Sequence, residues 1–97
     1  MLQDILAQNP ADAFARYGLA MEYANSGKLQ EAVDEFATLL NGHPDYTAGY
    51  FMAAQTLAKS NRTEEARKML QDGIAAAQRT GNEHARSEME GMLADLN

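Results

Sequence analysis

The breaks between predicted helices recur at a fixed spacing, and this spacing limits the possible folds more than any other feature of the sequence. Pro44 follows Pro10 at the same spacing at which Asn61 follows Gly27, a period of about 34 residues. Proline interrupts a helix because it lacks an N–H donor, while glycine or asparagine adopts the left-handed backbone that reverses a chain after a helix. A period of about 20–50 residues is typical of an array in which one small unit stacks on the next.

The residues between the breaks follow the same period. The matched pairs are Tyr17 and Phe51, Ala20 and Ala54, Tyr23 and Leu57, Glu31 and Glu65, Ala32 and Ala66, and Phe36 and Leu70. Small residues recur where antiparallel helices must approach closely, and large apolar residues recur where they fill the space between helices. The first segment also obeys the period, since Leu2 and Ile5 lie one period before Phe36 and Leu39. The sequence therefore predicts a repeated helical unit preceded by half a unit.

Six segments carry apolar residues at helical spacing, and none alternates like a strand for long enough to compete. We expect helices over residues 2–8, 11–25, 29–41, 45–60, 63–79 and 83–95. In the last segment an apolar stripe is backed by charged residues, which is typical of the helix that caps a solenoid. The predicted fold class is all-α, with about six helices.

Composition narrows the function. The chain of 97 residues is the size of one domain, and without cysteine it cannot form a disulfide or a thiolate metal site. Its net charge of −6 disfavours binding to nucleic acid, which needs lysine and arginine against phosphates. We interpret the acidity as a contribution to solubility, with an acidic binding surface as the alternative. With no signal peptide and no membrane-spanning run, we expect a cytoplasmic protein without a membrane partner.

The recurring residues are similar to the tetratricopeptide repeat (TPR) signature. Residues 13–46 carry Leu19, Ala20, Tyr23, Gly27, Ala32, Phe36 and Pro44, and residues 47–80 keep Tyr50, Ala54, Leu57, Ala66 and Leu70. The resemblance implies a right-handed α-solenoid of antiparallel helical hairpins. Residues 1–97 would form one TPR-like domain: a half-repeat helix in 1–12, repeats in 13–46 and 47–80, and a capping helix in 81–97. The half-repeat leaves open that the chain was cut from a longer array.

Three positions depart from this pattern. Asn61 replaces glycine at the turn, Gln78 replaces the closing proline, and Gly73 stands where a larger residue is usual. Without a proline to stop it, the fifth helix is expected to continue to about Arg79.

The resemblance also implies a binding surface, because in TPR proteins the first helices of successive hairpins line a concave groove that holds a partner's peptide or helix. Carried over, the groove residues are Phe14, Tyr17, Met21 and Asn25 from the second helix, and Ala48, Phe51, Gln55 and Lys59 from the fourth. Arg86 and Glu90 are expected to close the far end. A largely apolar, aromatic face suits an apolar peptide or an amphipathic helix. Alternatively, Tyr17 and Phe51 pack against each other between neighbouring helices.

Some TPR domains bind the acidic C-terminal tails of heat-shock chaperones through a clamp of lysine and asparagine. At the corresponding positions this chain has Tyr17, Met21 and Met52. We therefore do not expect it to bind such tails.

Residues able to carry catalysis are scarce. His43 lies in a loop before Pro44 without a nearby serine or cysteine, and we expect it to be a solvated loop residue. His84 and Glu88 are four apart on the last helix and could place two metal ligands side by side, but no second histidine completes a site. We expect no enzymatic activity, no metal and no cofactor.

Two functions remain. The favoured one is a protein–protein interaction module, or scaffold, that holds a segment of a partner in the apolar groove. The alternative is a homodimer in which a second copy covers the same apolar face, because large exposed apolar patches usually have a partner.

Overall fold

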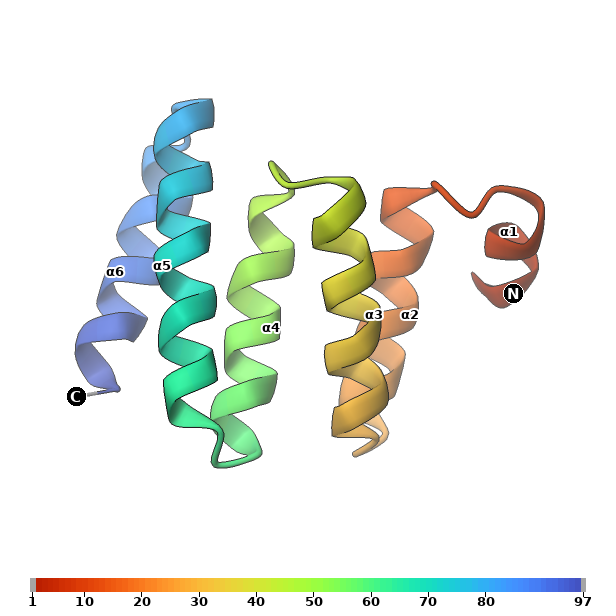
Figure 1. The fold of residues 1–97 in the computed structure, drawn as a ribbon, viewed down its shortest axis with the longest axis horizontal. Coiled ribbons are helices and arrows are strands. Elements are labelled where there is room, and N and C mark those ends of the chain that lie inside the picture. The colour runs from red at the N-terminus through yellow and green to blue at the C-terminus, as the bar shows by residue number, and fades with distance from the viewer. Residues whose placement is uncertain (1, 97) are drawn as a thin grey trace.

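The computed structural model describes residues 2–96, which form six α-helices and no strands (Figure 1). The helices are α1 (Leu2–Gln8), α2 (Ala13–Asn25), α3 (Leu29–Gly42), α4 (Thr47–Lys59), α5 (Thr63–Thr80) and α6 (Glu83–Asp95). Consecutive helices pack against each other along the whole chain, and α4 also touches α2 and α6. The result is a row of helical hairpins, 39 Å along its longest axis, with α3 and α5 nearer the viewer in Figure 1 than α2 and α6. The predicted all-α helical repeat is confirmed.

The turns inside the hairpins match the prediction made for them. Gly27 and Asn61 both have a left-handed backbone, with φ of 78° and 61°. The residue after each donates its amide back into the preceding helix: Lys28 to the Tyr23 carbonyl and Arg62 to the Leu57 carbonyl, both at 2.9 Å. These bonds satisfy carbonyls that a helix end would otherwise leave unpaired.

The loops between hairpins differ from the prediction, because α2 and α4 begin two residues later than expected. Each loop first forms a turn, in which Asp12 N–H donates to the Asn9 carbonyl and Tyr46 N–H to that of His43. Asp12 then caps α2 by accepting the Ala15 N–H at 2.9 Å.

The two proline carbonyls serve as acceptors that hold these loops to the following helix. Arg16 Nη2 donates to the Pro10 carbonyl at 3.2 Å. Tyr50 occupies the position one period after Arg16, and its hydroxyl donates to the Pro44 carbonyl at 2.7 Å. The same position in each repeat therefore donates a hydrogen bond to a proline carbonyl, although the donor is an arginine in one repeat and a tyrosine in the other.

The core lies between the helices of each hairpin and between successive hairpins. The small residues matched by the repeat period are fully buried, and so are large residues around them: Ala20, Ala32, Ala54, Ala66, Phe36 and Leu70. Burying one large apolar side chain contributes about 1.5–3 kcal/mol, so this recurring set provides much of the hydrophobic stabilisation.

Gly73 has a steric explanation. A Cβ atom placed on it would lie 2.5 Å from Met89 Sδ on α6 and 2.6 Å from Tyr50 Cβ on α4. Glycine therefore lets α5 approach both neighbours at one point. As expected, α5 runs on past the usual stop, to Thr80, where Gly81 ends it with φ of 70°.

Candidate binding groove

A groove runs along the side of the molecule formed by α2, α4 and α6. It consists of two adjoining hollows, of about 290 and 440 Å³. The first is lined by Tyr17, Thr47, Ala48, Phe51, Met52, Asn82, His84, Ala85 and Glu88. The second is lined by Phe51, Gln55, Ser87, Glu88, Gly91, Met92 and Asp95. Because Phe51 and Glu88 border both hollows, the two form one continuous surface, called the groove below.

The Tyr17 ring packs against two other aromatic rings. Its ring lies 6.3 Å from that of Phe36, edge to face, and 5.4 Å from that of Tyr46. Burial raises the pKa of the Tyr17 phenol above its usual value, and Tyr46 adds to the effect. Aromatic pairs of this kind add about 0.5–1.5 kcal/mol beyond their burial, so these contacts help to hold the Tyr17 ring in position.

Tyr17 and Phe51 belong to different parts of the core. Within residues 2–96 the aromatic ring partners of Tyr17 are Phe36 and Tyr46, and neither is Phe51. Phe51 packs instead on the buried cluster that contains Leu57 and Leu70. The two aromatic side chains border the first hollow from α2 and α4, so the space between them is open to a ligand.

The structure places four of the eight predicted groove residues along the two hollows. Tyr17, Phe51 and Gln55 line the hollows, as does Ala48. The others lie outside them. Phe14 is 77% exposed on α2, Met21 packs against the core, and Asn25 and Lys59 are exposed at the ends of their helices.

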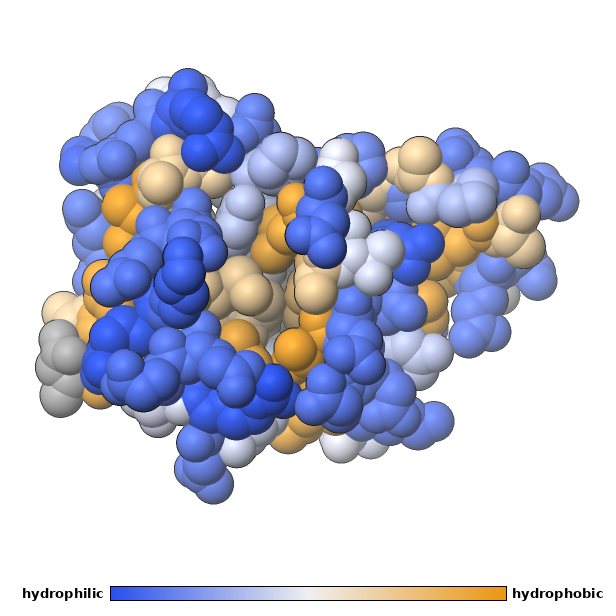
Figure 2. All heavy atoms as spheres, viewed as in Figure 1, coloured by the Kyte–Doolittle hydropathy of each residue, from blue (hydrophilic) through white to orange (hydrophobic). Residues whose placement is uncertain are grey.

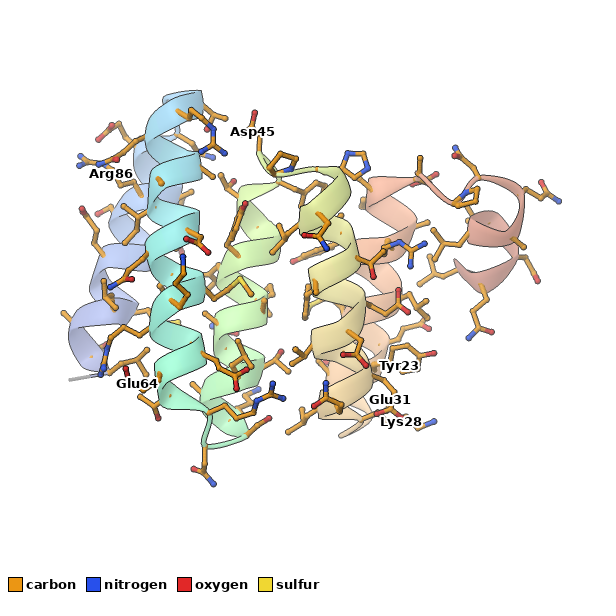
Figure 3. All side chains as sticks on the ribbon, in the orientation of Figure 1. Tyr23, Lys28, Glu31, Asp45, Glu64 and Arg86 are labelled. Carbon is orange, nitrogen blue, oxygen red and sulfur yellow. The ribbon has the colours of Figure 1, made fainter. Side chains whose placement is uncertain are left out.

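The α6 side of the groove differs from the prediction. Arg86 and Glu90, expected to close the far end, line neither hollow; Arg86 pairs with Glu83 at 2.5 Å and Glu90 at 3.8 Å. Figure 3 shows Arg86 at the outer edge of the molecule. Glu88 and Asp95 face the groove instead.

The reason is a change of spacing. α4 begins one repeat period after α2, but α6 begins two residues later than the period predicts from α4, because α5 is four residues longer than α3 while the loop that follows it is two residues shorter. One period after Phe51 and Gln55 lie Ala85 and Met89, whereas the residues that line the second hollow, Ser87 and Gly91, lie two positions further on. The sequence signal that could have given the right side was the apolar stripe of Ala85, Met89 and Met92, which marks the inward face.

The two histidines make separate contacts. His43, expected to be solvated, is half-buried, and its Nε2 lies 2.9 Å from the Ala11 carbonyl, which ties the two inter-hairpin loops together. His84 Nε2 lies 3.3 Å from Glu88 Oε1 on the exposed surface of α6. Residues 2–96 contain no group of three or more side chains placed to hold a metal ion. None of the described helices combines the length and apolar composition needed to cross a bilayer.

Another hollow, separate from the groove, lies on the opposite side, between α3 and α5. Figure 2 shows apolar side chains at the bottom of this hollow, framed by hydrophilic ones. Its floor includes Val33, Leu57 and Met69, and its rim carries Lys68 and Asp72, which pair with each other at 2.7 Å. The charges on its rim are thus partly neutralised by a lysine–carboxylate pair, whereas Glu88 in the groove pairs with His84 rather than with a lysine or arginine.

Comparison with known proteins identifies the family. The tetratricopeptide repeat model matches residues 23–88, which is more than half of the chain. A TPR repeat-containing protein of Pseudomonas aeruginosa is 26% identical to this chain over 95 residues. The matched region covers 98% of this chain and 90% of the length of that protein.

Solved structures agree with this assignment. The solution structure of a tetratricopeptide repeat domain protein from Salinibacter ruber superposes with a TM-score of 0.86 and 27% identity, over 92% of this chain and 90% of that one. YrrB, a TPR protein with an unusual peptide-binding site, superposes with a TM-score of 0.78 and 27% identity, over 93% of this chain and 45% of its own. The chain belongs to the tetratricopeptide repeat family.

Proposed function

We propose that this TPR protein is an interaction module that binds a peptide segment or helix of another protein in the groove between α2, α4 and α6. The observation that carries the proposal is the pair of adjoining hollows with Phe51 at their junction. A preformed apolar hollow reduces the ordering cost of binding, because the protein side chains around it are already in place. The TPR fold generally serves protein binding, and the similar YrrB has a peptide-binding site.

In the proposed mechanism an apolar side chain of the ligand enters the first hollow and is buried against Tyr17, Phe51 and Met52. Gln55, in the second hollow, offers an amide that can bond to the ligand backbone. The remaining predicted groove residues lie further out, and in this proposal they contact only ligands that extend beyond the two hollows: Phe14, Met21, Asn25 and Lys59.

The test uses a library of 12-residue peptides displayed on phage, selected on the wild-type protein and then measured by fluorescence anisotropy. Tyr17→Ala and Phe51→Ala should weaken binding by about tenfold or more, as expected for aromatic anchors at the centre of an interface. Lys28→Ala, which removes an exposed side chain in the turn between α2 and α3, outside both hollows, is the control. Circular dichroism checks that each variant is folded. Selected peptides that bind both aromatic variants with wild-type affinity would place the binding surface elsewhere.

Self-association is the second candidate, and the exposed apolar side chains near the N-terminus favour it. Phe14 is 77% exposed and Ile5 is 45% exposed, and these are the large hydrophobic side chains most open to solvent in residues 2–96. A second copy could cover them. Sedimentation equilibrium from micromolar to near-millimolar protein tests this, since the dimer should weaken in Phe14→Ala; a monomer throughout that range argues against it.

A further inference from the structure

We infer that the segment bound in the groove is basic as well as apolar: an apolar side chain fills the first hollow, and a neighbouring lysine or arginine pairs with Glu88 and Asp95 on α6. This inference rests on the proposed function and adds the chemistry of the partner. Of the two interpretations of the acidity given above, it takes up the acidic binding surface rather than the contribution to solubility.

The three walls of the groove differ in chemistry. α2 and α4 contribute aromatic, apolar and neutral polar side chains, including Tyr17, Phe51 and Gln55. α6 contributes the carboxylates, with Glu88 in both hollows and Asp95 in the second, and neither hollow is lined by a lysine or arginine. A ligand lying across the groove therefore meets an apolar side and an acidic side.

The two carboxylates in the groove have no lysine or arginine partner within the described chain. Every arginine in residues 2–96 pairs with a different carboxylate: Arg16 with Glu35, Arg62 with Glu65, Arg67 with Glu64, Arg79 with Asp45, and Arg86 with Glu83. Over the same residues, Glu88 pairs with His84, and neither a lysine nor an arginine pairs with Asp95. These two carboxylates are available to a cation from outside.

One short ligand segment can contact the apolar side and the acidic side of the groove at the same time. Glu88 borders the apolar first hollow as well as the second, so a cation next to the buried apolar residue reaches it. The volume of about 290 Å³ in the first hollow has room for a leucine or phenylalanine side chain. Only six residues separate Glu88 from Asp95, which places both carboxylates on the same side of α6 about two turns apart.

The negative net charge of the whole chain also favours a basic ligand. With a net charge of −6, the protein attracts basic segments and repels acidic ones before contact. Acidic peptides are therefore disfavoured both by the field at long range and by the two carboxylates in the groove.

The test measures binding of synthetic 12-residue peptides with a central leucine or phenylalanine flanked on both sides by lysine, serine or glutamate. Wild-type protein should bind the lysine peptides most tightly and the glutamate peptides least. In the Glu88→Gln/Asp95→Asn double variant, the preference for lysine over serine should fall by roughly tenfold, since each exposed ion pair contributes up to about fivefold in affinity. Binding of the serine peptides should change little.

The matched control is Glu83→Gln/Glu90→Gln, which removes two charges from the same helix but on the side that pairs with Arg86. It should retain the lysine preference apart from a small loss due to net charge. An equal loss in both double variants, or equal binding of lysine and serine peptides by wild type, overturns the inference while leaving the groove as a binding site. Failure of the wild type to bind any of the peptides, with either central residue and up to millimolar concentration, overturns the proposed function and this inference together.

Discussion

Gly73→Ala tests how closely α5 packs against its two neighbours. The added Cβ would lie 2.6 Å from Tyr50 Cβ and 2.5 Å from Met89 Sδ, whereas carbon atoms in ordinary contact are about 3.5–4.0 Å apart. The Met89 side chain is flexible but fully buried, so it has little free space to enter. Tyr50 Cβ is fixed to the backbone of α4, and its hydroxyl donates to the Pro44 carbonyl. To accommodate the methyl group, α4 and α5 must separate by about 1 Å.

Two opposing effects set the magnitude. Alanine stabilises a helix interior relative to glycine by about 0.5–1 kcal/mol. Overpacking a closely packed core costs about 1–3 kcal/mol, and two contacts this short at one site indicate the upper part of that range. Gly73→Ala should therefore lower the free energy of unfolding by roughly 1–2 kcal/mol.

Urea denaturation followed by circular dichroism measures the change, and two other glycines serve as controls. Gly91→Ala, on α6 with nothing within 4 Å of the new Cβ, keeps the gain in helix propensity without the clash and should stabilise the protein. In Gly49→Ala the nearest atoms to the new Cβ are the ends of flexible side chains, Leu39 Cδ2 at 3.0 Å and Leu40 Cδ2 at 3.1 Å. The free energy of unfolding of this variant should therefore lie between those of Gly73→Ala and Gly91→Ala. Equal stability of the Gly73→Ala and Gly91→Ala proteins would refute the steric argument.

Three further predictions concern the backbone, the caps and the pH. Gly27→Ala, at φ of 78° with open space around the new Cβ, should cost about 1–2 kcal/mol from backbone strain alone, measured by urea denaturation; no loss would contradict the left-handed turn. Asp12→Ala removes the cap of α2 and should cost about 1 kcal/mol in the same assay, whereas Asp12→Ser should restore most of it. Burial raises the pKa of the Tyr17 phenol, so the folded state favours the neutral form. That contribution is fully present below about pH 10, where the unfolded phenol ionises, and is lost as the pH rises through the folded pKa. The fall in urea midpoint between about pH 9 and about pH 12 should be shallower in Tyr17→Phe than in wild type.

The fold was predictable because each hairpin uses the same local chemistry. Gly27 and Asn61 reverse the chain in the same left-handed conformation, and the buried alanines mark where helices touch. The starts of α2 and α4 were predicted two residues early because the turn between each proline and its helix depends on hydrogen bonds in the loop, such as Tyr46 N–H to the His43 carbonyl. Helical periodicity does not report such bonds.

The groove was predictable only as far as the repeat extends. Tyr17 and Phe51 occupy matched positions one period apart, and both line the first hollow. Met21 and Gln55 are also matched, yet only Gln55 lines a hollow, because Met21 packs against the buried cluster that contains Phe36 and Ala53. Repeat equivalence gives the face of a helix, but the neighbouring helix decides whether that face borders a cavity.

The chemistry of the α6 wall follows from the same close contact that explains Gly73. Met89 is fully buried and lies close to Gly73, so it marks the side of α6 that faces α5. Residues on an α-helix are about 100° apart, so Glu88 and Asp95 lie about 100–120° to one side of Met89, while Arg86 and Glu90 lie about 60–100° to the other. The first pair accordingly faces the groove, and the second pair forms an ion pair away from it. The absence of a side chain at Gly73 therefore leaves room for Met89 to face α5, and with α6 in this orientation Glu88 and Asp95 lie on the side of the proposed binding site.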